Sequence, residues 1–206
     1  MALQSKAYRK PRFVVGIDEV GRGPLAGPVA VGALCVALEK KAHIRRVFNG
    51  IRDSKKLSAL AREKWAKVIK EEAAKGNLVY DVVFASNTII DKKGIAPTIR
   101  SLVARALKQL KINPETSEIL LDGSLKAPAE FTRQKTIIKG DDLILEISVA
   151  SVIAKVTRDA RMVRLAKKYP EYGFEVHKGY GTKRHAEQLR LLGPCNVHRK
   201  TFISKF

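Results

Sequence analysis

The chain has few of the residues that covalent cross-links, thiolate metal sites or membrane spans require. Its 206 residues include two cysteines, Cys35 and Cys195, whose separation fits no zinc motif. We expect both thiols to be free in a reducing cytosol. No apolar run approaches the roughly 20 residues of a transmembrane helix, and the first ten residues lack the apolar core of a signal peptide. These absences predict an intracellular, cytoplasmic protein without membrane attachment.

Acidic residues are also scarce, because 20 Asp and Glu stand against 40 Lys and Arg, which gives a formal net charge of +20. Such an excess either forms a solvated basic surface or binds a polyanion, and the basic residues that recur near the glycine motifs favour DNA or RNA. With 45% hydrophobic residues, the chain is long enough to fold around its own core without disulfides. We therefore expect a nucleic-acid-binding globular protein.

Residues 16–28 read Gly-Ile-Asp-Glu-Val-Gly-Arg-Gly-Pro-Leu-Ala-Gly-Pro and carry the strongest functional signal. They follow an apolar, strand-like run, so Asp18 and Glu19 lie where a strand should end. Carboxylates at a strand end can hold a hard cation, and a glycine-rich backbone can approach a phosphate or sugar closely. The segment indicates metal-dependent chemistry on a nucleic acid.

Apolar periodicity gives an alternation of strands and helices after an initial pair of strands. Turn residues bound each segment, with Ser58 as an N-cap and Ser86 or Asn87 as the cap of a further short helix. This order predicts an α/β protein with a mixed sheet of about five strands. The expected strands are 12–18, 28–38, 78–85, 119–123 and 135–141, and the expected helices are 58–75, 97–110, 145–167 and 182–192.

Three aspartates, Asp18, Asp122 and Asp141, each end an apolar strand-like run. If the strands of Asp18 and Asp122 are parallel neighbours, their ends lie about 5 Å apart. Such carboxylates need a cation, and oxygen donors suit Mg²⁺ or Mn²⁺. A single strand-end aspartate is more often a turn or cap residue, but three in one context favour a metal site. Strand alternation turns Glu19 away from Asp18 unless a turn begins there. Asp159 lies on the long helix, where it could form an ion pair with Arg158 or Arg161, or else support the metal site.

Several motifs together resemble ribonuclease HII of the bacterial type. They run in family order from residue 13 to about 202, and their number makes the resemblance specific. The motifs are Asp-Glu-Val-Gly-Arg-Gly-Pro-Leu-Ala-Gly-Pro-Val (18–29), Asp-Ser-Lys-Lys-Leu (53–57), Leu-Asp-Gly (121–123), Lys-Gly-Asp (139–141), Ala-Ser-Val-Ile-Ala-Lys-Val-Thr-Arg-Asp (150–159), His-Lys-Gly-Tyr-Gly-Thr (177–182), Gly-Pro (193–194) and His-Arg (198–199).

The resemblance implies a ribonuclease H-like fold, with five mixed strands in the order 3-2-1-4-5 and a C-terminal helical region. It implies one domain over 1–206, with a catalytic core over about 12–169 and a basic substrate-binding extension over about 170–206. The implied site is Asp18, Glu19, Asp122 and Asp141, which would hold two Mg²⁺ or Mn²⁺ ions during catalysis. Asp142 follows Asp141, so the fourth carboxylate could also come from Asp142 or Asp159.

The implied reaction is endonucleolytic cleavage of RNA in RNA/DNA hybrids, and incision on the 5′ side of single ribonucleotides in duplex DNA. It leaves 3′-hydroxyl and 5′-phosphate ends and serves ribonucleotide and RNA primer removal. Selectivity must depend on the 2′-hydroxyl, the group that separates RNA from DNA. We expect the backbone of Gly21, Arg22 and Gly23 to contact it and Tyr180 to stack on the next sugar. The expected phosphate contacts are Ser54, Lys55, Lys56, Lys178, Thr182 and Arg199; His177, His185 and His198 are phosphate contacts or packed tail residues.

Other readings stay open at this point. A Holliday-junction resolvase or transposase also clusters acids at strand ends, but would not be expected to need Gly-Arg-Gly for a 2′-hydroxyl. A non-catalytic RNA-binding module would show no Mg²⁺-dependent cleavage. Ribonuclease HIII shares parts of the pattern but usually has an extra N-terminal domain, and only about 12 residues precede the first expected strand. We expect a monomer, and the sequence assigns no sliding clamp or polymerase as a partner.

Overall fold

Five strands form one sheet in the order β3-β2-β1-β4-β5, as the resemblance implied. The computed structural model describes residues 10–51, 54 and 56–204. Strand β1 pairs antiparallel with β2 and parallel with β4, so the sheet is mixed. The strands are β1 (Phe13–Val20), β2 (Val29–Ala37), β3 (Val79–Ala85), β4 (Ser117–Asp122) and β5 (Gln134–Ile137).

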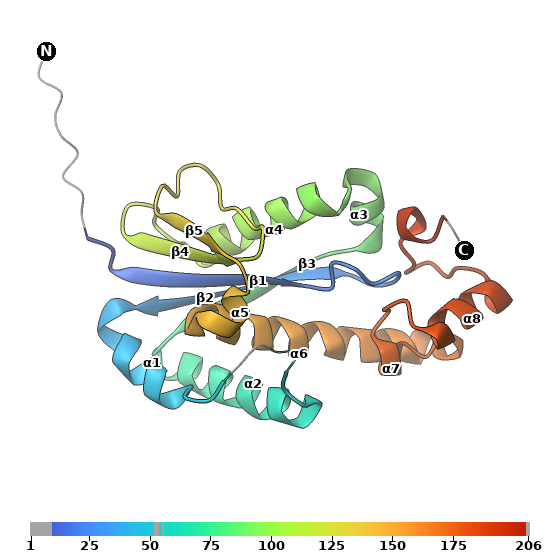
Figure 1. The fold of residues 1–206 in the computed structure, drawn as a ribbon, viewed down its shortest axis with the longest axis horizontal. Coiled ribbons are helices and arrows are strands. Elements are labelled where there is room, and N and C mark those ends of the chain that lie inside the picture. Colours follow the sequence, from blue (N-terminus) through green and yellow to red (C-terminus); the bar gives the residue numbers. More distant parts are fainter. Residues whose placement is uncertain (1–9, 52–53, 55, 205–206) are drawn as a thin grey trace, which may run out of the picture.

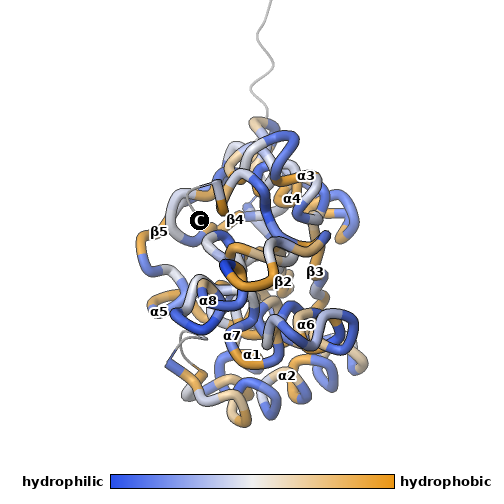
Figure 2. The backbone as a smooth tube through the Cα atoms, turned by 90° about the vertical axis from the view of Figure 1, so that its right-hand side faces the viewer, coloured by the Kyte–Doolittle hydropathy of each residue, from blue (hydrophilic) through white to orange (hydrophobic). Residues whose placement is uncertain are grey.

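Helices cover both faces of this sheet (Figure 1). Helices α3 (Asn87–Lys93) and α4 (Ile95–Gln109) lie on one face. Helices α1 (Lys41–Val47), α2 (Ala59–Ala74) and α6 (Leu145–Lys168) lie on the other. Figure 2 shows hydrophilic and hydrophobic segments alternating along the helices, as expected where one side of a helix is buried.

The remaining elements of the described residues are short. Helix α5 (Gly140–Leu143) connects β5 to α6, and α7 (Phe174–His177) and α8 (Lys183–Leu192) follow α6. Three 3₁₀ turns, η1 (Leu38–Lys40), η2 (Pro170–Tyr172) and η3 (Lys200–Phe202), lie at the ends of longer elements or near the C-terminus. Among the described residues, no helix is both long enough and apolar enough to cross a bilayer.

Alternation along the strands divides the core between the two faces. Val15 and Ile17 of β1 pack with α4, as do Ile119 and Leu121 of β4. Val14 packs with Ile147 at the start of α6 on the opposite side. Because side chains alternate every residue, Asp18 and Asp122 both face the side of the sheet that α6 covers.

Helix α6 crosses the sheet at close range, and a glycine makes this possible. A Cβ on Gly16 would lie 2.2 Å from the backbone carbon of Glu146. The helix therefore rests directly on the β1 backbone, and the residues one and two turns further along α6 come close to Asp18. The close packing of α6 on β1 at Gly16 thus sets how near the side chains of α6 lie to Asp18.

The expected elements are confirmed with small shifts in their ends, except near Asp141. Ser58 caps α2 through its hydroxyl, as the sequence predicted, and of the two cap candidates for α3, Ser86 and Asn87, Ser86 is the N-cap. Strand β5, however, ends at Ile137, and Asp141 lies in the first turn of α5. Lys139 adopts a left-handed conformation, with φ of 56°, and ends the extended run. Asp141 is therefore not a strand-end residue, which corrects that expectation.

The C-terminal region packs on the loop between β1 and β2, as expected for the tail. Ala26 forms an isolated bridge with His198, and the Leu25 N–H donates to the Gly179 carbonyl at 2.8 Å. Figure 1 shows α7 and α8 gathered at this end of the sheet. A small core of Ala26, Met162, Ala166, Tyr172, Phe174 and Leu189 fills the space between them.

Candidate active site

Three carboxylates from two strands meet at one edge of the sheet. The parallel register places Ile17 opposite Leu121, so Asp18 and Asp122 are the next positions on neighbouring strands. One oxygen each of Asp18, Glu19 and Asp122 lies within 4.8 Å of the others. The structure therefore brings Glu19 into the group, although strand alternation alone would turn it away.

Hydrogen bonds fix these carboxylates. Asp122 Oδ1 accepts from the Gly140 N–H at 2.7 Å, at the start of α5. Asp18 Oδ1 accepts from the Glu19 N–H at 2.7 Å, and its carboxylate also bonds the Ser151 hydroxyl of α6. Ser54 Oγ lies 2.9 Å from Ser151 Oγ. A line of two hydroxyls thus connects the segment before α2 to Asp18.

Burial and like charges make the ionised group unfavourable on its own. Asp18 is 4% exposed, and burial raises its pKa to about 8, with further increases from the charges of Glu19, Asp122 and Asp141. Burial also raises the pKa of Glu19, against the opposing charge of Arg22. Negative charges so close together need a neutralising cation to be ionised at once.

The donor set suits a hard divalent cation. All donors are carboxylate oxygens, the ligands that Mg²⁺ and Mn²⁺ prefer. Glu19 Oε2 is buried and has no hydrogen-bond partner among the described residues. A buried carboxylate oxygen without a donor is costly unless a cation takes that place. The cluster of Asp18, Glu19 and Asp122 is thus consistent with a divalent metal site.

Asp141 lies beside the group without belonging to its closest set. It is 5% exposed, its backbone N–H is 3.4 Å from Asp122 Oδ1, and its charge acts on Asp18. Asp159 is elsewhere: it pairs with Lys155 at 3.0 Å and lies 3.9 Å from Arg158 Nη1. Asp142 pairs with Lys56 at 2.5 Å. Of the three candidates for a fourth carboxylate, Asp141 is the one that lies next to the cluster.

A groove adjoins the carboxylates. One cavity of about 530 Å³ is lined by Asp18 and Glu19 together with Gly21, Arg22, Gly23 and Tyr180. A second cavity of about 640 Å³ shares Arg62, Lys155 and Tyr180 with the first and extends along α6. Asp18, Glu19, the Gly-Arg-Gly segment and Tyr180 therefore line one cavity.

The Gly-Arg-Gly loop is supported from behind by buried arginines. Gly21 has φ of +86°, and a Cβ there would lie 2.0 Å from Arg158 Nε. Arg158 is fully buried and donates to the Pro28 carbonyl at 2.9 Å and the Lys178 carbonyl at 3.1 Å. Arg22 points outward, with Nη1 3.5 Å from Glu19 Oε1. The loop has little freedom to change its shape.

Arg199 was expected to contact phosphate, and the structure corrects this. Its side chain is 0% exposed, and its guanidinium donates to the carbonyls of Gly21, Arg22 and Gly27 at 2.7, 2.8 and 3.0 Å. A guanidinium enclosed in this way cannot reach a nucleic-acid backbone. Arg199 holds the loop instead.

The other expected phosphate contacts have varied environments. Ser54 is 2% exposed and its hydroxyl is engaged with Ser151. Thr182 caps α8 through its hydroxyl, and the Lys178 Nζ donates to the Glu175 carbonyl. Lys56 is exposed beside Asp142. Lys55, like Asp53 of the same motif, lies outside the described residues.

The three C-terminal histidines are packed tail residues. The rings of His177 and His185 stack with centroids 4.3 Å apart, and His185 Nε2 lies 3.1 Å from His198 Nε2. Burial lowers the pKa of all three, that of His198 to about 4. Of the two readings left open for these residues, the structure supports packing.

Three residues of the groove or its support, Arg62, Ser151 and Lys155, were given no role from the sequence, and Arg158 was expected only as a possible partner of Asp159. Arg62 donates to the carbonyls of Ser54 and Leu57 at 2.8 and 2.6 Å. Lys155 Nζ lies 5.5 Å from the centre of the Tyr180 ring. The spacing of Ser151, Lys155 and Arg158 puts them on one stripe of α6, and polar residues on the buried side of an expected helix were the available signal.

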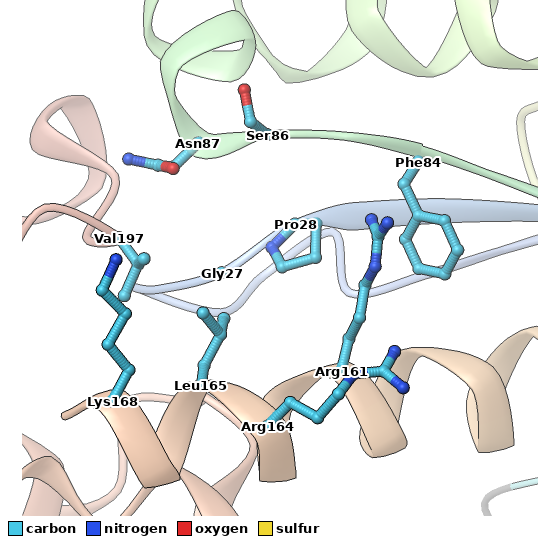
Figure 3. Close-up of a pocket in the computed structure, with 10 residues that line it drawn as sticks. All are labelled: Gly27, Pro28, Phe84, Ser86, Asn87, Arg161, Arg164, Leu165, Lys168 and Val197. Carbon is cyan, nitrogen blue, oxygen red and sulfur yellow. The ribbon is translucent and has the colours of Figure 1, made fainter. Parts of the chain in front are cut away.

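A further cavity, of about 350 Å³, opens beside the end of β3 and contains no acid among its lining residues (Figure 3). Arg161, Arg164 and Lys168 extend into it from α6, and the Arg161 guanidinium lies 4.1 Å from the centre of the Phe84 ring. Its lining lacks the carboxylates, so the candidate active site is the groove beside Asp18.

Known proteins resemble this chain over most of its length. The family model of ribonuclease HII matches residues 15–205. A ribonuclease HII of Caldicellulosiruptor bescii is 43% identical over 93% of this chain and 87% of its own length, and one of Prochlorococcus marinus is 43% identical over 97% and 98%.

Solved structures agree. The structure of the PCNA:RNase HII complex from Archaeoglobus fulgidus superposes with a TM-score of 0.74 at 25% identity, covering 91% of this chain and 93% of the other. The ribonuclease H2 of Pyrococcus horikoshii gives 0.70 at 26% identity, covering 92% and 93%. The sheet order, the carboxylates at the ends of β1 and β4 and these similarities agree, and the chain belongs to the ribonuclease HII family.

Proposed function

We propose that Asp18, Glu19, Asp122 and Asp141 together hold the divalent ions with which this ribonuclease HII cleaves its substrate. The activity follows from the family: ribonuclease HII cleaves RNA in RNA/DNA hybrids, including at single embedded ribonucleotides. The observation that supports the assignment is the convergence of three carboxylate oxygens within 4.8 Å, in a cavity that also contains the Gly-Arg-Gly loop.

Mg²⁺ or Mn²⁺, with two ions present during catalysis, would supply water activation and charge neutralisation at the departing 3′ oxygen. The protein supplies the fixed ligands. Asp18 is the most buried of the three, and its carboxylate is held by the Ser151 hydroxyl and by the Glu19 N–H. The Gly140 N–H holds Asp122 and places Asp141 beside it. No side-chain nucleophile is required.

Substrate selection belongs to the groove beside the acids. The backbone of Gly21, Arg22 and Gly23 recognises the 2′-hydroxyl, and Tyr180 stacks on the sugar of the next nucleotide. Tyr180 is suited to this because it is 39% exposed and its ring centre lies 5.5 Å from Lys155 Nζ and 5.7 Å from Arg158 Cζ. Incision then falls on the 5′ side of the ribonucleotide and leaves 3′-hydroxyl and 5′-phosphate ends.

The region from about 170 to 206 acts as a substrate-binding extension of the core over about 12–169. It contributes Tyr180 to the groove and Lys178 to its continuation along α6. Lys55, Lys56 and Lys178 supply positive charge for the phosphates. We also propose that the protein works as a monomer.

A duplex with one embedded ribonucleotide tests the proposal. Wild-type protein is expected to cut it with Mg²⁺ or Mn²⁺ and not with EDTA, and to leave an all-DNA duplex or a four-way junction intact. Asp18→Asn and Asp122→Asn should each abolish cleavage, whereas Asp142→Asn, which removes an acid paired to Lys56, should retain it. Near-wild-type turnover by Asp18→Asn or Asp122→Asn would contradict the assignment, and cutting of the all-DNA substrates would favour a resolvase.

A further inference from the structure

We propose that His198 and Arg199 are positioning residues for ribonucleotide selectivity, acting on two walls of the groove without touching the substrate. Arg199 orients the Gly-Arg-Gly loop, and His198 fixes the Tyr180 backbone through His185. The inference deepens the proposed function and rests on it, because both walls are assigned there to reading the substrate.

Arg199 determines which way the loop peptides face. Its guanidinium donates to the carbonyls of Gly21 and Arg22 at 2.7 and 2.8 Å, across 178 and 177 positions of sequence. A trans peptide holds its C=O and the following N–H antiparallel. With the two carbonyls turned toward Arg199, the N–H groups of Arg22 and Gly23 are turned to the opposite side. The loop lines the groove and Arg199 does not, so these donors are presented to the substrate.

A planar guanidinium suits this task better than a point charge. A third donor, Nε, bonds the Gly27 carbonyl at 3.0 Å, so one rigid group holds both ends of the loop. An ammonium at this position could not make the same three bonds in one plane. The loop would keep its charge environment and lose its fixed orientation.

His198 controls the other wall by a chain of hydrogen bonds with one consistent direction. The Cys195 N–H donates to His198 Nδ1 at 3.0 Å, so that nitrogen carries the lone pair. His198 Nε2–H then donates to His185 Nε2 at 3.1 Å, and His185 Nδ1–H donates to the Tyr180 carbonyl at 2.9 Å. Every ring nitrogen of the pair is satisfied in the neutral form. The backbone of Tyr180 is thereby tied to the C-terminal segment.

The segment that contains both residues is itself anchored. The Arg199 N–H donates to the Leu25 carbonyl at 2.8 Å, and the Gly27 N–H donates to the Val197 carbonyl at 2.8 Å. Asp91 of α3 accepts from the backbone of Lys200 and Thr201 at 3.0 Å. His198 and Arg199 are 2% and 0% exposed, so neither can contact a duplex directly. Their influence on the reaction must pass through the loop and Tyr180.

Two matched sets of variants test the proposal. Asn places an amide oxygen near the position of His Nδ1, and Gln places an amide nitrogen near that of Nε2. His198→Gln should therefore keep the bond to His185, whereas His198→Asn should keep only the bond from Cys195. Arg199→Lys breaks the three-carbonyl contact. Arg164→Lys, in the cavity of Figure 3, is the control for an arginine outside the groove.

We would measure kcat and KM on two duplexes, one with a single ribonucleotide and one with a 2′-fluoro nucleotide at the same position. The Kd for an all-DNA duplex and the Tm would be measured for each variant as well. Arg199→Lys and His198→Asn should lower kcat/KM on the ribonucleotide substrate by about 10- to 100-fold. Both variants should also reduce the ratio of kcat/KM on the ribonucleotide duplex to kcat/KM on the 2′-fluoro duplex, and the Kd for the all-DNA duplex should be unchanged. His198→Gln and Arg164→Lys should behave like wild type.

Unchanged selectivity in Arg199→Lys and His198→Asn, with wild-type cleavage intact, would overturn the positioning role alone. An equal loss for His198→Asn and His198→Gln would do the same, since it would indicate a merely structural role. Wild-type protein that fails to cut the ribonucleotide duplex in Mg²⁺ would overturn the proposed function and this inference together. If Arg199→Lys does not fold, the comparison of His198→Asn with His198→Gln still tests whether the C-terminal segment controls selectivity.

Discussion

Asp18→Asn should abolish metal-dependent cleavage and, in the absence of metal, make the folded protein more stable than the wild type. An unfolded Asp has a pKa near 3.8, whereas burial raises that of folded Asp18 to about 8. Each pKa unit corresponds to about 1.4 kcal/mol, so the carboxyl group disfavours folding by up to roughly 4 kcal/mol at pH 7. Asn is neutral, and its amide oxygen can still accept from the Glu19 N–H.

The sign of the pH effect makes the test sharp. The folded pKa of Asp18 is raised, so the stability of the wild type is fully present below pH 4 and is lost as pH rises toward 8. The advantage of Asp18→Asn in EDTA should therefore be near zero at pH 4 and largest near pH 8. The unfavourable contribution of the Asp18 carboxyl grows to roughly 5 kcal/mol at pH 8, which for a chain of this size corresponds to an increase in Tm of about 10–20 °C.

Thermal unfolding in EDTA measures the stability of the metal-free protein, and thermal unfolding in Mg²⁺ measures how much metal binding adds to it. Wild-type protein should gain stability when Mg²⁺ is added, because binding to the folded state alone stabilises it. Asp18→Asn should gain much less. Asp142→Asn serves as the control, since its side chain is paired with Lys56, and should show no rise in Tm in EDTA. A lower Tm of Asp18→Asn than of wild type at pH 8 in EDTA would refute the electrostatic reasoning.

Three further outcomes can be measured on the same protein. Tyr180→Ala should reduce the preference for an RNA–DNA junction about tenfold, with Tyr180→Phe close to wild type; equal preference in all three would remove the stacking role. Lys56→Ala and Lys178→Ala should weaken hybrid and DNA binding alike and reduce the salt slope of log K by about 1 each, as titrations at several salt concentrations would reveal. Burial lowers the pKa of His198 to about 4, from 6.5 in the unfolded chain. The neutral imidazole therefore contributes its full stabilisation above pH 6.5, and this contribution is lost as the pH falls toward 4. In urea unfolding, the free energy of unfolding of His198→Gln should fall by about 3 kcal/mol less than that of wild type between pH 6.5 and pH 4. An equal dependence of that free energy on pH in the two proteins would contradict the reasoning.

Much of the fold could be predicted because it depends on local pattern. Apolar runs and caps located all five strands and the main helices, and Ser58 and Ser86 occupy the cap positions expected of them. The parallel pairing of β1 and β4 was the assumption that joined Asp18 to Asp122, and it is confirmed. Asp141 shows the limit, because the apolar run before it extends past the end of the strand and a left-handed Lys139 redirects the chain.

The support of the site could not be predicted, because it depends on contacts between distant parts of the chain. An exposed arginine at a phosphate and a buried arginine under a loop look the same in a sequence. Arg199 was expected to be the first and is the second, since burial is a property of the packed fold. Likewise, Ser151 is one small residue on an apolar helix, and its bond to Asp18 exists only because α6 rests on Gly16.

The long reach from Arg199 back to Gly21 also has a meaning for protein synthesis. A ribosome releases the carboxylates of β1 and β4 well before it reaches residue 199. A chain that stops short could fold its sheet and assemble its acids while the loop beside them still lacks its brace. Under the proposed roles, a product that lacks residues 199–206 but still folds would keep the carboxylates of β1 and β4 and lose the guanidinium that holds the Gly-Arg-Gly loop, and such an enzyme would be a greater hazard to a genome than an inactive fragment.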